Sequence, residues 1–374
     1  MRSGISYFNG TVFKKTVLRF WPVWAAYFVI WFIALPLNGL MMLSMAMGGT
    51  IRNIGYMESF ACRTVPGLAS GLSLTMAVAF GLLSAMAVFS HLYSARPANF
   101  FGTLPVTREG LFVTHYLAGL SFLIVPNVVI ALLTLIIEAI GGWVSIQGLW
   151  FWLAISCGEC LLFYSMAVFC AMFTGHILAL PVFYTVFNAI AAGVYGLAIW
   201  VSSAFFYGYT SSGGDWGYRA ARLLTPVWRL NGSVYSYYQG STYAVSSAPA
   251  GELAATPKLE TVGLGLVGGY AAAALVLAVC AFLLYRVRRL ESAGDVVSVK
   301  PMRPVFKYGV AVCSGFTFGL GTSFFLNMGE VGLMVSIVVW GIAGYFVAQM
   351  LLDKSFRVFK KWKGAAADSL VTSA

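Results

Sequence analysis

Charged side chains are scarce in this sequence. Asp, Glu, Lys and Arg make up 9% of the 374 residues, whereas 60% are hydrophobic. A soluble domain of ordinary composition has about a quarter of its residues charged. So few charges cannot cover a water-facing surface, which excludes an ordinary soluble globular protein.

Sequence motifs of catalysis are missing as well. G-x-x-x-x-G-K-[ST] does not occur, so the chain has no ATP-binding P-loop of its own. H-E-x-x-H and the nucleophile-elbow motif are also absent, and His91, His115 and His176 are far apart in the sequence. We therefore expect no enzyme activity from this chain alone, no cofactor and no metal.

Cysteines are few, and they do not form a metal-binding pattern. Cys157 and Cys160 form a C-x-x-C, but no second pair and no histidine cluster lies near it. All but Cys62 lie in apolar stretches, where a free thiol behaves as a small hydrophobic group. The sequence therefore favours a structural role for these cysteines, as small hydrophobic side chains, over a redox or metal-binding role. The six cysteines are Cys62, Cys157, Cys160, Cys170, Cys280 and Cys313.

Long apolar runs, by contrast, recur from end to end. A helix of about 20 apolar residues crosses the ~30 Å of hydrocarbon in a bilayer, whereas a transmembrane barrel shows alternating segments of about ten. The sequence therefore predicts an all-α polytopic membrane protein with about eight transmembrane helices. The predicted spans are Val23–Met45, Leu68–Phe89, Leu111–Ile137, Leu149–Phe173, Ile177–Phe206, Val262–Tyr285, Phe306–Leu326 and Val331–Leu352. Pro181 is expected to bend or delay the fifth.

The distribution of Lys and Arg predicts the orientation of these spans. With a cytoplasmic N-terminus, inner segments hold 17 of the 23 basic residues and outer segments hold 6, so both termini are expected to be cytoplasmic. The net charge of +11 then faces anionic lipid, which leaves little support for nucleic acid as a partner. The outer residues are Arg52, Arg63, Arg219, Arg222, Arg229 and Lys258. The first apolar run is too long for a signal peptide and no cleavage site follows it, so no cleaved leader is expected.

Two segments outside the spans have an amphipathic pattern. The stretch before Trp21 mixes apolar residues with Lys14, Lys15 and Arg19 at helical spacing, which predicts a helix lying in the inner membrane interface. In the long outer segment Tyr207–Lys258, "YRAARLLTPVWRL" predicts one short interfacial helix. The first part of that segment is rich in glycine and serine, and its tail, "GSTYAVSSAPAGELAATP", is expected to be a solvated loop.

Small residues at a spacing of four occur in three places. They are Gly67/Gly71, Gly265/Gly269 and Gly315/Gly319. Such pairs let helix backbones approach closely. Packing within the chain is favoured over a dedicated dimer contact.

Glu159 is the one acidic residue deep within a predicted span. A carboxylate at the centre of a bilayer costs a few kcal/mol, so it should face the bundle interior or be protonated. Two roles remain open. Glu159 lines a path for substrate or protons, or it forms a structural hydrogen bond to Ser156, Tyr164 or a neighbouring helix.

A short charged segment, "SARPANFFGTLPVTREG", separates the second and third predicted spans on the inner side. Apolar groups rimmed by charge usually mark a docking surface, so a cytoplasmic protein is the expected partner. The apolar residues of this segment lie on one predicted helical turn and are Phe100, Phe101 and Leu104. Charged residues flank the turn, with Arg96 before it and Arg108 and Glu109 after it.

Four blocks of the sequence resemble permease subunits of ABC-2-type ABC transporters from Gram-positive bacteria. They are "HLYSARPANFFGTLPVTREGLFVTHYLAGL" (His91–Leu120), "YFNGTVFKKTVLRFWPVWAAY" (Tyr7–Tyr27), "LLYRVRRLESAGD" (Leu283–Asp295) and "CAMFTGHILALPVFY" (Cys170–Tyr184). The resemblance extends over most of residues 1–360. It implies an N-terminal elbow helix, a six-helix core and a coupling helix, here Ser94–Leu104, that enters a groove of a separate ATPase subunit.

The resemblance and the predicted spans together imply the domain organisation, and the resemblance implies the function. Residues 1–22 would be the elbow, 23–290 the six-span core, and 291–374 a basic inner loop, two spans beyond the family's six and a cytoplasmic tail. The expected function is export across the bacterial plasma membrane. Aromatic-rich spans without a charged lining favour an amphipathic peptide, antibiotic or lipid-like compound as the substrate. The partners would be an ABC ATPase subunit that binds ATP and Mg, and a second permease copy or a paralogue.

Two other classes of function compete with this one. An ion- or proton-coupled secondary transporter would use Glu159, but such proteins usually carry several intramembrane carboxylates or broken helices in matching halves. A membrane-embedded enzyme would need a catalytic constellation. The ABC permease is the favoured reading, and the secondary transporter is the alternative.

Overall fold

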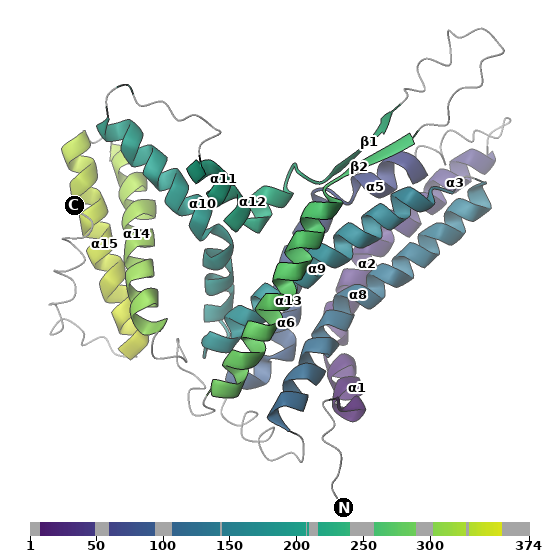
Figure 1. Cartoon of the computed structure of the whole chain (residues 1–374), viewed down its shortest axis with the longest axis horizontal. Coiled ribbons are helices and arrows are strands. Elements are labelled where there is room, and N and C mark those ends of the chain that lie inside the picture. Colours follow the sequence, from purple (N-terminus) through teal and green to yellow (C-terminus); the bar gives the residue numbers. More distant parts are fainter. Residues whose placement is uncertain are drawn as a thin grey trace, which may run out of the picture. The chain divides into compact units, whose positions relative to one another are not determined.

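The computed structural model describes residues 8–48, 60–93, 107–142, 144–206, 208, 216–239, 258–288, 302–326 and 329–353. These residues are nearly all helical, with a single two-stranded sheet among them (Figure 1). They divide into two compact units. The first takes in Met1–His91, Phe100–Ala171 and Thr225–Arg286, and the second Leu92–Asn99, Met172–Leu224 and Val287–Ala374.

Six helices in the described part of the chain are long and apolar enough to cross a membrane. At a rise of 1.5 Å per residue, each exceeds the ~30 Å of hydrocarbon in a bilayer. The prediction of a polytopic α-helical membrane protein is confirmed. The six are Trp21–Gly48, α8 (Arg108–Gly141), α9 (Ile146–Phe173), α10 (Ala179–Phe205), α13 (Leu264–Val287) and α15 (Glu330–Asp353).

Prolines within these helices have local effects. The helix Trp21–Gly48 consists of α2 (Trp21–Phe32), the π-helical turn η1 (Ile33–Leu37) and α3 (Asn38–Gly48). Pro36 lies in η1, where it has no N–H to donate to the preceding turn. Pro181 lies in the first turn of α10, where backbone N–H groups have no intrahelical acceptor, so the helix still begins at Ala179.

The second predicted span, Leu68–Phe89, is not one straight helix. A π-helical turn, η2 (Phe60–Thr64), and the short α5 (Val65–Gly67) lead into α6 (Leu72–Val88), and the two parts are bent by 42°. Gly71 lies at the break with φ of +71°, a left-handed conformation that favours glycine. The predicted continuous helix is therefore wrong at this point, although the pair still passes as a broken span.

The seventh and eighth predicted spans correspond to α14 (Met302–Leu326) and α15, which pack together closely (Figure 1). Of the two, α15 is among the six membrane-length helices. A Cβ atom on Gly319 would lie 2.7 Å from the Cα of Ile337, and one on Gly315 would lie 3.2 Å from the Cα of Gly341. Packing within the chain is therefore confirmed for Gly315/Gly319. The count of eight spans stays a prediction.

The other two glycine pairs do not mediate close packing among the described residues. A Cβ atom on Gly67, Gly71, Gly265 or Gly269 would meet no described atom within 4 Å. The same four-residue spacing therefore has different consequences in different helices.

The core of the first unit is built from α6, α8, α9 and the helix Trp21–Gly48. Trp31 and Trp152 pack edge to face with their ring centroids 4.9 Å apart. Gly81 on α6 lies against the backbone of α9, since a Cβ atom there would be 3.0 Å from the nitrogen of Tyr164. This close approach lets polar side chains on α6 and α9 reach one another.

The predicted N-terminal helix is confirmed as α1 (Gly10–Arg19). Asn9 caps it, because its side-chain oxygen accepts hydrogen bonds from the backbone N–H groups of Thr11 and Val12, both at 3.1 Å. The N–H of Asn9 donates to the hydroxyl of Thr114 at 3.1 Å, which ties α1 to α8.

The structure of the predicted outer segment differs from the single helix that the sequence predicts. Instead of one helix there are two, α11 (Trp216–Leu224) and α12 (Pro226–Leu230), because Pro226 cannot donate to the preceding turn. The sheet was not predicted. Its strands β1 (Tyr235–Gln239) and β2 (Lys258–Val262) pair antiparallel with Tyr235 opposite Val262.

Candidate functional site

Glu159 lies on α9 and is buried, with 2% of its surface exposed. The hydroxyl of Ser73 on α6 donates to its carboxylate at 2.6 Å and lies 2.9 Å from the hydroxyl of Ser156. The sequence predicted Ser156, Tyr164 or a neighbouring helix as the partner of Glu159. The direct partner is Ser73 on the neighbouring helix α6, and Ser156 is linked to Glu159 through Ser73. Tyr164 instead donates to the carbonyl of Tyr116 at 3.0 Å. The geometry makes Glu159 a hydrogen-bonded link between two packed helices.

A second polar cluster surrounds the C-x-x-C. The hydroxyl of Tyr27 donates to the side-chain oxygen of Asn127 at 2.9 Å and lies 3.3 Å from the sulfur of Cys160. The amide of Asn127 reaches the sulfurs of Cys157 and Cys160 at 3.9 and 4.0 Å. Both thiols are free, so these cysteines act as weak polar contacts between helices.

The sequence did not predict a second buried carboxylate, that of Glu138. The third predicted span ends at Ile137, but α8 continues to Gly141 and thereby includes Glu138, which is fully buried. Its carboxylate accepts the backbone N–H of Ser145 at 3.1 Å, at the start of α9. Glu138 therefore holds the α8–α9 turn. The only sequence signal for this turn was the pair Gly141 and Gly142, which follows Glu138.

Two histidines that are distant in sequence lie together in the first unit. The rings of His91 and His115 have centroids 4.7 Å apart, and both side chains are buried. The Nδ1 atom of His91 is 3.1 Å from the carbonyl of Val88. Among the described residues, no group of three or more His, Cys, Asp or Glu side chains could hold a metal ion.

Arg108 and Glu109, two of the predicted coupling residues, begin α8, where the hydroxyl of Thr107 caps the helix. The carboxylate of Glu109 forms an ion pair with Arg286 near the end of α13, with 3.0 Å between Nε and the oxygen. The guanidinium of Arg108 lies 5.9 Å from the ring centroid of Tyr285. The start of α8 is thus held by the end of α13.

Arg288, just past the end of α13, is buried, with 6% of its surface exposed. It donates to the carbonyl of Met172 at 3.1 Å and to that of Leu92 at 3.2 Å, and it lies 6.0 Å from the ring centroid of Tyr93. A buried cation is costly unless it is paired or hydrogen-bonded. The sequence predicted Arg288 only as one of many inner basic residues, so its structural role was missed.

These contacts lie on either side of segment 94–106. Leu92 precedes the segment and bonds to Arg288, and Glu109 follows it and pairs with Arg286. Four of the predicted coupling residues fall within this segment and lie outside the described residues. They are Arg96, Phe100, Phe101 and Leu104.

The described polar groups can therefore hold helices in register and link helix ends. Within the described ranges, they present no three-ligand metal cluster. Comparisons of the chain with protein-family models, with curated proteins and with solved structures found no match.

Proposed function

We propose that this chain is the membrane-embedded permease subunit of an ABC-2-type transporter that works with a separate ATPase subunit. Two observations support the proposal. Four blocks of its sequence resemble this family. The part of the chain that the structure describes also has six membrane-length helices and an amphipathic helix, α1, immediately before the first of them.

The orientation follows from the basic residues. With both termini at the cytoplasmic face of a bacterial plasma membrane, the inner segments carry 17 basic residues and the outer ones 6. Segment 94–106 then faces the cytoplasm, where an ATPase subunit is available. Phe100, Phe101 and Leu104 would enter a groove of that subunit, with Arg96, Arg108 and Glu109 at the rim.

The contacts that flank segment 94–106 support the coupling part of the proposal. Arg288 bonds to Leu92 on the preceding side, and Arg286 pairs with Glu109 on the following side. A displacement of the docking segment would therefore reach α8 through its first turn and α13 through its last residues. ATP binding would close the ATPase pair, and these links would pass the motion to the spans as rigid-body movement.

The composition of the chain supports the proposed substrate class. Aromatic residues make up 16% of the chain and charged ones 9%, which suits an amphipathic peptide, antibiotic or lipid-like compound. Export is the direction that the resemblance implies. A second copy of the chain, or a paralogue, would complete the transporter.

Co-purification tests this function. The tagged chain would be expressed in a bacterium that encodes it, extracted in a mild detergent and purified, and its partners identified by mass spectrometry. We expect one P-loop ATPase in near-stoichiometric amount. It should be absent from a control purification of an unrelated tagged membrane protein. Recovery of the chain alone, in a detergent that keeps a known ABC transporter assembled, would contradict the proposal.

A further inference from the structure

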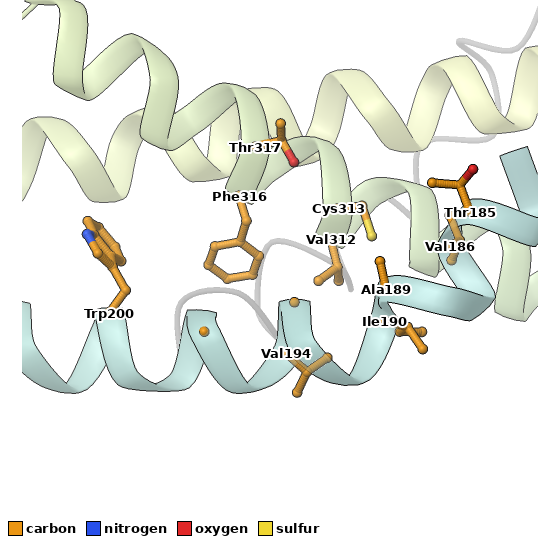
Figure 2. Close-up of a pocket in the computed structure, with 12 residues that line it drawn as sticks. Thr185, Val186, Ala189, Ile190, Val194, Trp200, Val312, Cys313, Phe316 and Thr317 are labelled. Carbon is orange, nitrogen blue, oxygen red and sulfur yellow. The ribbon is translucent and has the colours of Figure 1, made fainter. Parts of the chain in front are cut away.

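A long apolar groove lies between α10 and α14 in the second unit (Figure 2). Its volume is about 550 Å³, within the range of small-molecule sites. Val194 and Trp200 of α10 and Val312 and Phe316 of α14 are among its lining residues (Figure 2). A second cavity of about 410 Å³ shares part of this lining and extends it to Phe306.

The lining of the groove excludes a charged occupant. Among its described lining residues, the polar groups are the hydroxyls of two threonines, the thiol of Cys313 and the indole N–H of Trp200, and none of these residues is Asp, Glu, Lys, Arg or His. The hydroxyl of Thr185 already donates to the carbonyl of Pro181 at 2.9 Å. Burying a charge here without a partner would be costly, so the part of a ligand that enters is hydrocarbon.

The groove is elongated along the helices. Its lining on α10 runs from Thr185 to Trp200, and at 1.5 Å per residue this stretch covers roughly 20 Å. Phe183 stacks on Phe306 with ring centroids 5.1 Å apart, next to the Thr185 end. An extended alkyl chain matches this length better than a compact ring compound.

Positive charge lies just beyond the Phe306 end. Phe306, Val310, Cys313 and Thr317 line the second cavity at spacings of three and four, which places them on one face of α14. Arg303 is three residues before Phe306 and continues this row, and its side chain is exposed. A guanidinium in this position suits a phosphate group, which it can bind through two hydrogen bonds.

We propose that this groove binds an acyl chain of an anionic phospholipid, whose phosphate lies at Arg303. The helices that form it belong to a chain with membrane-length apolar helices, so bilayer lipid is the ligand present at highest concentration. An anionic headgroup complements Arg303, and the chain fills the apolar length between α10 and α14. This site does not depend on the partnership with an ATPase.

Photo-crosslinking of the full-length chain tests the site. The purified protein in detergent would be incubated with phosphatidylglycerol or phosphatidylcholine carrying a photoreactive group in the acyl chain, and the labelled peptides mapped by mass spectrometry. We expect adducts concentrated on peptides from α10 and α14, with phosphatidylglycerol preferred. Adducts spread evenly over all helices would mean bulk lipid only and would overturn the proposal.

Matched variants locate the chain and the headgroup. Gly193 lines the groove and has open space at its Cβ position, so Gly193→Leu fills the groove without a backbone clash. It should lower labelling of α10 and α14 roughly tenfold, equivalent to about 1.4 kcal/mol. Gly268→Leu on α13, at an equally open position, should leave labelling unchanged. Ala189→Leu, at another lining position, repeats the test if Gly193→Leu does not purify.

The charge variant is Arg303→Gln, with Arg219→Gln as the control on α11. Arg303→Gln should reduce the preference for phosphatidylglycerol roughly fivefold, the contribution of one basic residue near a membrane surface. An unchanged preference would overturn the assignment of the phosphate. Labelling of the groove by a neutral photoreactive alkyl glycoside, with none by phosphatidylglycerol, would assign it to a transported compound and also overturn the proposal.

Discussion

Arg286 and Glu109 form an ion pair at 3.0 Å that joins the last turn of α13 to the first turn of α8. Two residues further along, Arg288 is buried and bonds to the carbonyls of Met172 and Leu92. One helix end thus contacts residues on both sides of segment 94–106. The exposed pair and the buried arginine are expected to differ strongly in their contribution to stability.

Arg288→Gln should destabilise the folded protein by about 3 kcal/mol, because removing a buried, hydrogen-bonded cation leaves two carbonyls without their donor. Arg286→Gln should change stability by less than about 1 kcal/mol, since Arg286 is 55% exposed in its ion pair. The measurement is the fraction of each variant that stays monodisperse in gel filtration after heating. Equal losses for the two variants would contradict the distinction.

Glu159→Gln should leave folding and transport intact, because a glutamine oxygen can still accept from Ser73. Glu159→Ala should lower stability by about 1–3 kcal/mol, because it leaves buried hydroxyls unsatisfied. Transport in vesicles and thermal stability would both be measured, with Ser73→Ala as the variant that breaks the same hydrogen bond from α6. Full stability of Glu159→Gln with complete loss of transport would favour a proton- or substrate-coupling role instead.

Gly319→Leu should disrupt the packing of α14 on α15, because even a Cβ atom there would lie 2.7 Å from the Cα of Ile337. Overpacking of this kind costs about 1–3 kcal/mol. Gly321→Leu is the control on the same helix, at a position with no described atom within 4 Å of its Cβ. Thermal unfolding in detergent should separate the two variants, and equal midpoints would contradict the close packing of α14 on α15.

The orientation of the spans predicts which loops reagents can reach. In a cysteine-free background, a cysteine at Ser246 should react with an impermeant maleimide in intact cells, and one at Ser298 should react only after lysis. Both positions lie between predicted spans, in the proposed outer and inner segments respectively. The reverse labelling pattern would contradict the eight-span arrangement.

The membrane helices were predictable because hydrocarbon thickness sets the length of an apolar run. The fourth predicted span, Leu149–Phe173, ends at the same residue as α9 and starts three residues after it. The break at Gly71 was not predictable, since a glycine in an apolar run is compatible with a straight helix or a bend. The sheet was missed because its strands are short and lie beside glycine- and serine-rich sequence.

The buried polar contacts were less predictable than the helices. Glu159 was identified from its position alone, but its partner Ser73 is 86 residues away, and their meeting depends on how closely α6 and α9 pack. Arg288 looked like an ordinary inner basic residue, because its burial depends on where Met172 and Leu92 present their carbonyls. Such information is tertiary and is not contained in local pattern.

The most direct test of the central claim is the double substitution Phe100→Ala with Phe101→Ala. Buried aromatic anchors each contribute roughly 2 kcal/mol or more to an interface, so losing two should weaken binding of the ATPase subunit by at least about two orders of magnitude. Arg108→Ala is the milder control, because rim charges contribute less to affinity.

The measurement is pull-down of the ATPase subunit together with ATP hydrolysis and transport in reconstituted vesicles. We expect the double variant to insert and purify normally but to lose both the ATPase and transport, while Arg108→Ala retains most of each. A double variant that still binds the ATPase subunit and transports normally would contradict the assignment of segment 94–106 as the coupling element.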